Sequence, residues 1–487
     1  MGCSNEQPFF IWTFMKKIII LSALFLVCKV YSQQVQWASK LIKYSTDLGG
    51  KQYGVKRILG KPDAFPQGGS SPNAWVPKNA LDGYEFVEVG FEKPQTVKQI
   101  AIFENLNAGC VTRVLVDTGN GKYTGVWGRK KDWKTPTYKA TLTGDRNYYF
   151  GRKRRKIQKA PEVNFNPGIE NIILDSPVSN VVAVRVEFSF ALVPGQKQID
   201  AIGISDSDKP LDASISVNPL FEELQQSSVV DLGNVVPGSI AISPDGNKMY
   251  VTNINSDKDE IVSFTQNASG NWGNMQNEAS LSNNDYYNFF AKITPTYALK
   301  GGKTYTRGTT QTGFEIYTYQ NGNIQFEKDV NVVAYNNYDN TADASLTKDK
   351  SVLIMAIETD FTQGGSDLYF SKIKEDGTYG ILQSMGKVVN SAGDEFMCHL
   401  LSDDKTLLFV SNGYSGFGDN DIYLTKRLDD TWKNWSEPVN LGSKINSNDY
   451  DGNPYYDETA EKLYYTSSVN GELKVKNISI PKKLLIK

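Results

Sequence analysis

Three features of the 487-residue sequence predict an all-β fold. The second half contains five copies of one pattern, a polar turn followed by a strand-like apolar run. Aromatic residues make up 12% of the chain and Gly occurs 41 times, a mixture that favours strands separated by turns. From about residue 84 apolar and polar residues alternate, as in half-buried strands. Together these features predict a jelly-roll β-sandwich followed by a five-bladed β-propeller.

The chain begins with a segment that we expect to be removed. From Met15 it reads MKKIIILSALFLVCKVYSQ, a basic pair followed by an apolar stretch of export-signal length and a small residue before Gln33. This predicts that residues 1–32 are an upstream extension and a secretory signal peptide. Beyond residue 35 no apolar run reaches the length of about 18 residues that spans a bilayer. We therefore expect no membrane-spanning segment in the mature chain.

The predicted sandwich covers residues 33–208. Its start shows helical spacing of Ala38, Leu41 and Ile42 without strong caps. From YEFVEVGF onwards the pattern becomes strands separated by Gly and Asn turns.

Two further segments interrupt or follow these strands. Residues 128–161 are a basic insertion containing GRKKDWK and GRKRRK. It is either a solvated loop or an anchoring patch for an anionic polymer or membrane surface. Residues 209–227 are polar and lack periodicity, which predicts a linker.

The predicted propeller covers residues 228–482, and a basic tail follows at 483–487. Each repeat offers an inner strand, a polar turn and two further strands. The third strands are centred on aliphatic residues that recur every 51–55 positions, at Ile261, Ile316, Leu368, Ile422 and Leu473. Such a period, filled with short strands, is typical of propeller blades.

The fifth blade has no outer strand of its own. The segment VVDLGNVV (229–236) matches the outer-strand pattern PVNLGSKI (438–445). We predict that it completes the fifth blade and closes the ring, which removes an exposed sheet edge.

Charge and composition exclude several kinds of site. The net charge of −2 argues against a nucleic-acid binder. Only Cys110 and Cys398 remain after cleavage, so no disulfide framework or Cys-rich metal site is expected. His399 is the only histidine, which excludes a His-ligated zinc site and leaves little room for a Ser-His-Asp triad. We expect His399 to lie in the core or channel wall rather than to act in catalysis, and we predict no catalytic residue.

The loops that precede the inner strands carry repeated acidic residues. At one mouth of the channel they would form a ring of oxygen ligands, which could bind a ligand or Ca²⁺, the one cofactor considered. The other interpretation is that they are ordinary turn residues. The candidates are Asp285, Asp339, Asp394, Glu395, Asp449 and Asp451. Asp367 and Asp421, which precede the third strands, are predicted to bond backbone amides across a turn.

A second set of candidates lies in the predicted loops of the sandwich. Jelly-roll modules bind carbohydrate through polar loop groups and an aromatic platform. Trp75 would either stack on a sugar or plug the bottom of the sandwich. The set comprises Asn73, Trp75, Asp82, Asn105 and Asn107.

Two blocks of the sequence resemble known families. Residues 390–454, with SDDKTLLFVSNGYSGFGDNDIYLTK at their centre, resemble the WD40-like (PD40) repeats of Bacteroidetes envelope proteins. Those repeats are common in OmpA-family proteins, including components linked to gliding and type IX secretion. KRILGKPDAFPQGGSSPNAWVP (56–77) and RVEFSFALVPGQKQIDAIGISDS (185–207) are similar to discoidin (galactose-binding-like) jelly rolls.

The resemblance implies a non-enzymatic cell-envelope protein that binds a protein partner or a glycan, with a role as a secretion or gliding accessory. The alternative is a glycan-processing or other hydrolytic propeller that uses channel carboxylates. Because the acidic loops repeat so evenly, they do not suggest the unequal carboxylate pair that acid–base catalysis needs. The chain stops at Lys487 without an OmpA-like or sorting domain. We therefore expect no peptidoglycan anchoring, and a periplasmic or outer-membrane-associated protein rather than a secreted one.

Overall fold

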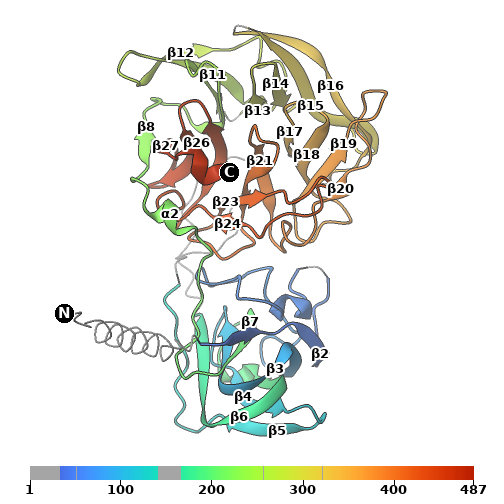
Figure 1. Cartoon of the computed structure of the whole chain (residues 1–487), viewed down its shortest axis with the longest axis vertical. Coiled ribbons are helices and arrows are strands. Elements are labelled where there is room, and N and C mark those ends of the chain that lie inside the picture. Colours follow the sequence, from blue (N-terminus) through green and yellow to red (C-terminus); the bar gives the residue numbers. More distant parts are fainter. Residues whose placement is uncertain (1–32, 51, 141–165, 256, 321, 487) are drawn as a thin grey trace, which may run out of the picture.

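The computed structural model describes residues 33–50, 52–140, 166–255, 257–320 and 322–486. The predicted signal peptide and the second part of the basic insertion lie outside these residues. The described chain forms two β-domains, with the five blades of the propeller arranged around a centre and the sandwich beneath them (Figure 1). The predicted all-β fold with a five-bladed propeller is confirmed.

The N-terminal domain is one seven-stranded sheet in the order β1-β7-β3-β6-β4-β5, with β2 paired to β3. Its strands are β1 (Val35–Trp37), β2 (Lys40–Tyr44), β3 (Tyr84–Glu104), β4 (Val111–Asp117), β5 (Tyr123–Gly128), β6 (Gly168–Ser189) and β7 (Ala201–Ser205).

This sheet folds over its own core. β3 and β6 pair along their length, but the register shifts between Gly90 and Gln99 of β3. Val87 from the first half of β3 and Ile102 from the second half lie in the same buried cluster. The two halves therefore face each other as the layers of a sandwich.

The helical spacing at the start of the domain was misleading. Val35–Trp37 pair with β7, and Lys40–Tyr44 pair with β3. Ala38 is fully buried, whereas Ile42 is exposed, so the apolar residues do not share one face of a helix. The hydrogen-bonding edges of β3 and β7 outweigh a weak local preference.

Each propeller blade is a four-stranded antiparallel sheet. Blade 1 contains β9 (Pro237–Ile242), β10 (Lys248–Asn253), β11 (Glu260–Gln266) and β12 (Trp272–Asn277). Blade 2 contains β13 (Phe289–Ile293), β14 (Tyr297–Gly301), β15 (Thr309–Gln320) and β16 (Asn323–Tyr335). Blade 3 contains β17 (Asp343–Leu346), β18 (Val352–Ile357), β19 (Asp367–Lys372) and β20 (Gln383–Ser384). Blade 4 contains β21 (Glu395–Leu400), β22 (Thr406–Ser411), β23 (Asp421–Lys426) and β24 (Val439–Asn440). Blade 5 contains β25 (Asp451–Asp457), β26 (Lys462–Val469), β27 (Glu472–Ser479) and β8 (Ser228–Val230).

Strand alternation produces the packing between blades. In β22, Leu407 and Phe409 join the core shared with blade 3, whereas Leu408 and Val410 join the core shared with blade 5. Successive side chains of a strand point to opposite faces of its sheet. A strand buried on both faces therefore reads as the continuous apolar run TLLFVS.

The predicted closure of the ring is confirmed. Val230 pairs with Val475 and Ser228 with Asn477, so β8 is the outer strand of blade 5. The match extends over three residues rather than the whole of 229–236. The outer strands β20 and β24 are also short, with two residues each.

The predicted linker is held against both domains. Leu211 joins a small core with Phe103 of β3. The short helix α2 (Pro219–Glu222) is capped by the side chain of Asn218 and buries Phe221 among blades 4 and 5. The other helical turns of the described residues are η1 (Val55–Ile58), η2 (Phe190–Leu192) and α3 (Lys482–Leu485).

Candidate functional site

The propeller presents two different faces. In each blade the inner strand begins on the side where the second strand ends and the third strand begins, as β17, β18 and β19 show. The loops that lead into the inner strands and those that join second to third strands therefore lie on one side of the propeller. We call this side the loop face; it carries every acidic candidate predicted in the propeller. The opposite side, the turn face, carries the tight turns between first and second strands. Backbone bonds join neighbouring loops of the loop face, such as Asp259 to Tyr286 and Tyr338 to Glu358.

Asp367 and Asp421 cap turns on the loop face, as predicted. Asp367 accepts hydrogen bonds from the backbone amides of Gln363 and Gly364 at 2.7 and 3.3 Å. Asp421 accepts from the Phe417 and Gly418 amides at 2.6 and 3.1 Å. Both carboxylates are buried, so they stabilise loops and present no oxygen to solvent.

Two of the acidic candidates are buried in the same way. Glu395 accepts from the Ser391 amide and from the hydroxyls of Ser391 and Ser411. Burial, followed by the nearby charge of Asp367, raises the pKa of Glu395 to about 8. Asp451 accepts from the amide and hydroxyl of Ser447, and burial raises its pKa to about 6. Both side chains are fully buried and lie within their own loops.

The other four acidic candidates reach solvent to different extents. Asp285 and Asp449 are exposed. Asp339 is half-buried and accepts from the Asn340 amide. Asp394 is half-buried and accepts from the Ser366 amide and the Asn412 side chain. The ring expected from the sequence is therefore uneven, with its accessible carboxylates mainly in blades 1, 2 and 5.

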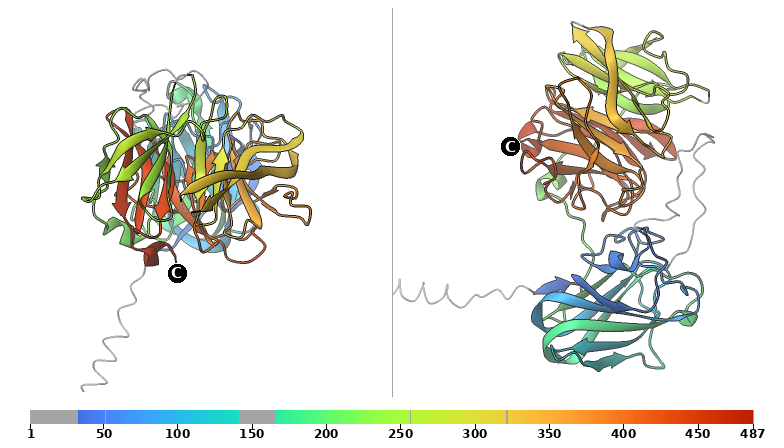
Figure 2. Two further views of the ribbon diagram at one scale, coloured as in Figure 1. Left: turned by 90° about the horizontal axis from the view of Figure 1, so that it is seen from above. Right: turned by 90° about the vertical axis from the view of Figure 1, so that its right-hand side faces the viewer.

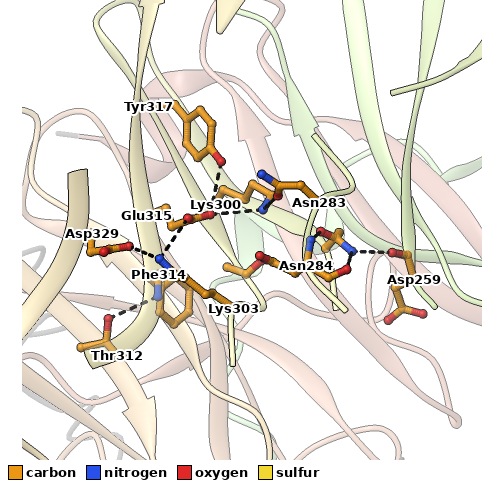
Figure 3. A network of polar contacts seen from close by, with 12 residues as sticks. Asp259, Asn283, Asn284, Lys300, Lys303, Thr312, Phe314, Glu315, Tyr317 and Asp329 are labelled. Carbon is orange, nitrogen blue, oxygen red and sulfur yellow. Dashed lines mark hydrogen bonds and ion pairs between the residues drawn. The ribbon is translucent and has the colours of Figure 1, made fainter. Parts of the chain in front are cut away.

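Blade 2 holds its third-strand carboxylate with lysines instead of backbone amides (Figure 3). Glu315 occupies the position that Asp421 has in blade 4, at the start of the paired part of the third strand. The Lys300 ammonium lies 3.2 Å from the Glu315 carboxylate and donates to Asn283 at 2.6 Å. Lys303 lies 3.6 Å from Glu315 and 2.6 Å from Asp329. Lys300 is fully buried, and burial lowers its pKa.

Side chains close the axis of the propeller toward the turn face. The Lys292 ammonium donates to the carbonyls of Leu346 and Leu400, at 3.1 and 2.7 Å. The Tyr455 hydroxyl donates to the carbonyls of Ile242 and Ile293, at 3.0 and 3.1 Å. These two side chains thereby connect all five inner strands, β9, β13, β17, β21 and β25.

His399 lies at this closed end. It is 5% exposed, and its ring lies 4.7 Å from the ring of Tyr455. Burial, helped by the charge of Lys292, lowers its pKa to about 3. His399 is thus neutral in the core of the propeller.

Residues 52–73 of the sandwich contact the loop face. The Arg57 guanidinium donates to the Gln363 carbonyl at 3.1 Å, and the Gln67 amide donates to the Tyr414 carbonyl at 2.9 Å. In the reverse direction the Ser415 hydroxyl donates to the Pro62 carbonyl at 2.8 Å. These contacts lie on loops of blades 3 and 4, and Figure 2 shows the sandwich beside that part of the propeller.

Asn73, a predicted carbohydrate ligand, belongs to this contact. Its side-chain amide donates to the Gly413 carbonyl at 2.6 Å, and the residue is fully buried. Asn105, also fully buried, donates to the carbonyl of Gly69 and to Gln198. These two residues hold and dock the loop 52–73.

Trp75 lies in the core of the sandwich. It is fully buried, packs against Phe188, and donates its indole N–H to the Thr46 carbonyl. Of the two interpretations of Trp75, the structure supports the plug. Asp82 is exposed, and the half-buried Asn107 donates to the Gln196 carbonyl. The structure therefore does not gather the five sandwich candidates into one accessible site.

The described part of the basic insertion is partly held by the sandwich. Trp133 donates to the Glu170 carboxylate at 3.0 Å, and Arg129 donates to the Gly109 carbonyl. Burial raises the pKa of Glu170 to about 7. The GRKRRK stretch lies outside the described residues.

Within the residues that the structure describes, no group of three or more His, Cys, Asp or Glu side chains is placed to hold a metal ion. The calcium site therefore stays a prediction. In the same part of the chain, no helix is long and apolar enough to cross a membrane.

Sequence analysis predicted Asp285 and Asp339 in one accessible stretch of the loop face, but it missed the exposed aromatic rings and Asp360 there. We call the loops 282–288, 302–308, 336–342 and 357–361 the open arc. The rings of Tyr286 and Phe361 in this arc are 63% and 78% exposed. The sequence signal was an aromatic residue beside each aspartate, but only the structure separates exposed rings from buried ones.

No family model and no curated protein matches the chain. Among solved structures it is similar to TolB from Acinetobacter baumannii, at 11% identity and a TM-score of 0.29, over 51% of this chain and 55% of that one. It is also similar to α-L-arabinofuranosidase from Lactobacillus brevis, at 9% identity and a TM-score of 0.32, over 51% of this chain and 92% of that one. A luciferin-regenerating enzyme matches at 10% identity and a TM-score of 0.28, over 52% of this chain and 95% of that one. The chain thus spans about half the length of TolB, and the assignment of the fold rests on its own strand pairing.

Proposed function

We propose that this protein is a non-enzymatic binding or scaffolding module of the cell envelope, which engages a partner through the open arc. The observation that supports this most strongly is the division of the loop face. The sandwich contacts loops of blade 4 and Gln363 of blade 3. The open arc exposes Asp285 and Tyr286 before blade 2, and Asp360 and Phe361 earlier in the blade 3 loop that contains Gln363. Exposed aromatic rings beside polar groups are typical of binding surfaces. We propose an exported, periplasmic or outer-membrane-associated location from the signal-like segment before Gln33.

Buried acids are poor candidates for hydrolysis. Burial raises the pKa of Glu395 to about 8 and that of Asp421 to about 7, values that would suit a general acid. Both carboxylates are enclosed by their own turns, however, and at most 1% exposed. If the ligand is a glycan, we therefore propose that the protein binds it rather than cleaves it.

The test is affinity purification from native envelopes with the tagged full chain. We expect one stoichiometric partner, lost from the variant Tyr286→Ala/Phe361→Ala and retained by the turn-face variant Asp376→Asn/Asp430→Asn. Recovery of the chain alone, with a glycan-array signal, would instead assign it to glycan binding. Turnover of a glycan substrate that Glu395→Gln abolishes would refute the proposal.

A further inference from the structure

The described part of the basic insertion lies as a strap against the sandwich. We call residues 128–139, GRKKDWKTPTYK, the basic strap. Near its start the Arg129 amide donates to the Thr112 carbonyl at 2.8 Å. Near its end the Tyr138 ring lies 5.0 Å from the ring of Phe65. The sandwich therefore holds the strap at both ends.

The middle of the strap presents an aromatic surface in a fixed orientation. The Trp133 amide donates to the Lys130 carbonyl at 3.1 Å, which closes a turn. Its indole N–H donates to the Glu170 carboxylate at 3.0 Å, and its ring lies 5.2 Å from that of Trp127, edge to face. Both indoles are half-buried, so part of each ring reaches solvent. An aromatic ring held in this way can stack on the C–H face of a sugar.

The lysines of the strap surround this surface and have no ionic partner. Lys130, Lys131, Lys134 and Lys139 are all exposed. Among the residues that the structure describes, none of the four forms an ion pair. The strap contains one carboxylate, Asp132. Four ammonium groups in ten residues therefore give this surface an excess of positive charge.

The carboxylates next to the strap do not neutralise these lysines. Glu170 is bonded to the Trp133 indole, and Glu104 accepts from two backbone amides at 3.0 and 3.1 Å. Both are buried, and burial raises the pKa of each to about 7. The nearby charge of Arg129 acts on both in the opposite direction. Arg129 therefore serves the buried acids, and the lysines remain for a ligand.

The side chains of the strap fit a polymer better than a lipid bilayer. Peripheral membrane binding adds the insertion of apolar side chains to the attraction of anionic lipids. In the described stretch 85–140 no large apolar side chain is exposed. The half-buried indoles can stack on a ligand at the surface, whereas they do not project far enough to insert.

We propose that the basic strap binds an acidic polysaccharide, with a sugar ring on Trp133 and sugar carboxylates on Lys130, Lys131 and Lys134. Ammonium–carboxylate hydrogen bonds are charge-assisted, and the repeated acid groups of one polymer let several weak contacts act together. The strap belongs to the sandwich and the open arc to the propeller. This inference therefore goes beyond the proposed function and does not depend on it.

The probe is fluorescein-labelled oligogalacturonate, a linear polymer of sugar acids, titrated against the full chain by fluorescence anisotropy. At about 0.15 M salt, distant surface charges are screened. We expect Lys130→Gln/Lys131→Gln/Lys134→Gln to weaken binding by about tenfold, the equivalent of about 1.4 kcal/mol. Unchanged binding by this variant would overturn the inference.

The matched control removes the same charge from the propeller. It replaces three lysines that are exposed and form no ion pair among the described residues, in Lys387→Gln/Lys405→Gln/Lys433→Gln. Its affinity for oligogalacturonate should stay within about twofold of the original. Weakening equal to that of the strap variant would show that only the overall charge matters, and would overturn the inference.

The aromatic contact is tested separately with Trp133→Ala. This variant should bind oligogalacturonate about fivefold more weakly, and polyaspartate, which has carboxylates but no sugar rings, within about twofold of the original. Equal weakening for the two polymers would reduce the interaction to charge and overturn the assignment to a polysaccharide.

Two comparisons exclude other sources of binding. Residues 152–156 are also basic, so the titrations are repeated with all five of these residues replaced by Gln. Complete loss of binding in that background would overturn the inference, and an unchanged ratio between strap variant and original would support it. Vesicles of phosphatidylglycerol and phosphatidylcholine are the second comparison. Vesicle binding that depends on the strap lysines, without binding of oligogalacturonate, would assign the strap to membranes and overturn the inference.

Discussion

The loops of blades 3 and 4 and those of blades 1 and 2 occupy equivalent positions but have different surroundings. Around the covered loops glycines allow close contact: a Cβ on Gly413 would lie 1.6 Å from the Ser391 hydroxyl, and one on Gly416 would lie 2.9 Å from the Gln67 amide. In blades 1 and 2 the loops end in exposed side chains such as Asp285 and Tyr286. The same framework thus provides a surface for a domain contact on one side and an accessible surface on the other.

The difference extends to the buried carboxylates. Asp421 of blade 4 accepts hydrogen bonds from neighbouring amides, so the fold places no second charge beside it. Glu315 of blade 2 is neutralised by Lys300, which places two opposite charges in the interior. A carboxylate bonded by amides of its own turn needs no partner from elsewhere. A buried ion pair needs both partners, because removing one leaves the other charge buried without compensation.

The largest change in the free energy of unfolding is expected on breaking the buried Lys300–Glu315 ion pair. Glu315→Leu leaves the buried Lys300 ammonium without its carboxylate, and should lower the free energy of unfolding by about 3–5 kcal/mol. Chemical denaturation followed by tryptophan fluorescence measures this. The double variant Lys300→Met/Glu315→Leu should recover most of the loss, because it removes the stranded charge. A single variant as stable as the original would show that the pair is not coupled.

Glu395 gives a pH dependence. Its pKa is about 8 in the folded protein and about 4.3 in an unfolded chain. The folded state therefore binds the extra proton, and the stability this provides is present in full below about pH 4 and lost as the pH rises toward 8. Glu395→Gln should flatten the fall in the free energy of unfolding between pH 5 and 8.5, measured by chemical denaturation, by up to about 4 kcal/mol. Parallel curves for the two proteins would contradict the assignment.

The docking of the sandwich should respond more weakly. Asn73→Ala removes the hydrogen bond to the Gly413 carbonyl and leaves that carbonyl buried, a loss of about 1 kcal/mol from the domain contact. Hydrogen exchange at residues 411–416 should become faster. Asn340→Ala, on an exposed loop of the open arc, is the control and should leave that exchange unchanged.

The smallest effect is expected at the open arc itself. Tyr286→Ala and Phe361→Ala should each change the free energy of unfolding by less than about 0.5 kcal/mol, because the rings are mostly exposed. Thermal denaturation of each variant provides the measurement. A fall of several kilocalories per mole in the free energy of unfolding would mean that the rings stabilise the loops and are not free to bind a ligand.

Features that depend on residues close together in the sequence could be predicted from it. Asp421 and the amides that it caps lie within four residues, so the turn could be inferred from GDNDIY. The continuous apolar run from Leu407 to Val410 predicts a strand buried on both faces. The strands β1 and β2 could not be inferred, because their pairing edges lie in β7 and β3.

The role of Asn73 was hidden for the same reason on a larger scale. Its partner, Gly413, is 340 residues away in the sequence. A polar residue in a loop looks the same whether it faces a sugar or a second domain. The exposed rings of the open arc were equally hidden, because Tyr286 and the half-buried Tyr287 are neighbours in sequence and differ only in their surroundings.

The pairing of β8 with β27 has a consequence for how the propeller forms. Ser228 near the start of the propeller pairs with Asn477 near its end, so β8 cannot join its sheet until almost the whole domain is present. Closing so long a loop carries a high entropic cost and slows folding. Until blade 5 arrives, the four preceding blades form an open arch with unpaired backbone at each end. A nascent chain that stalls before residue 472 would therefore be prone to pair with other chains. Pairing of β8 with β27 removes these unpaired edges and with them this risk of aggregation.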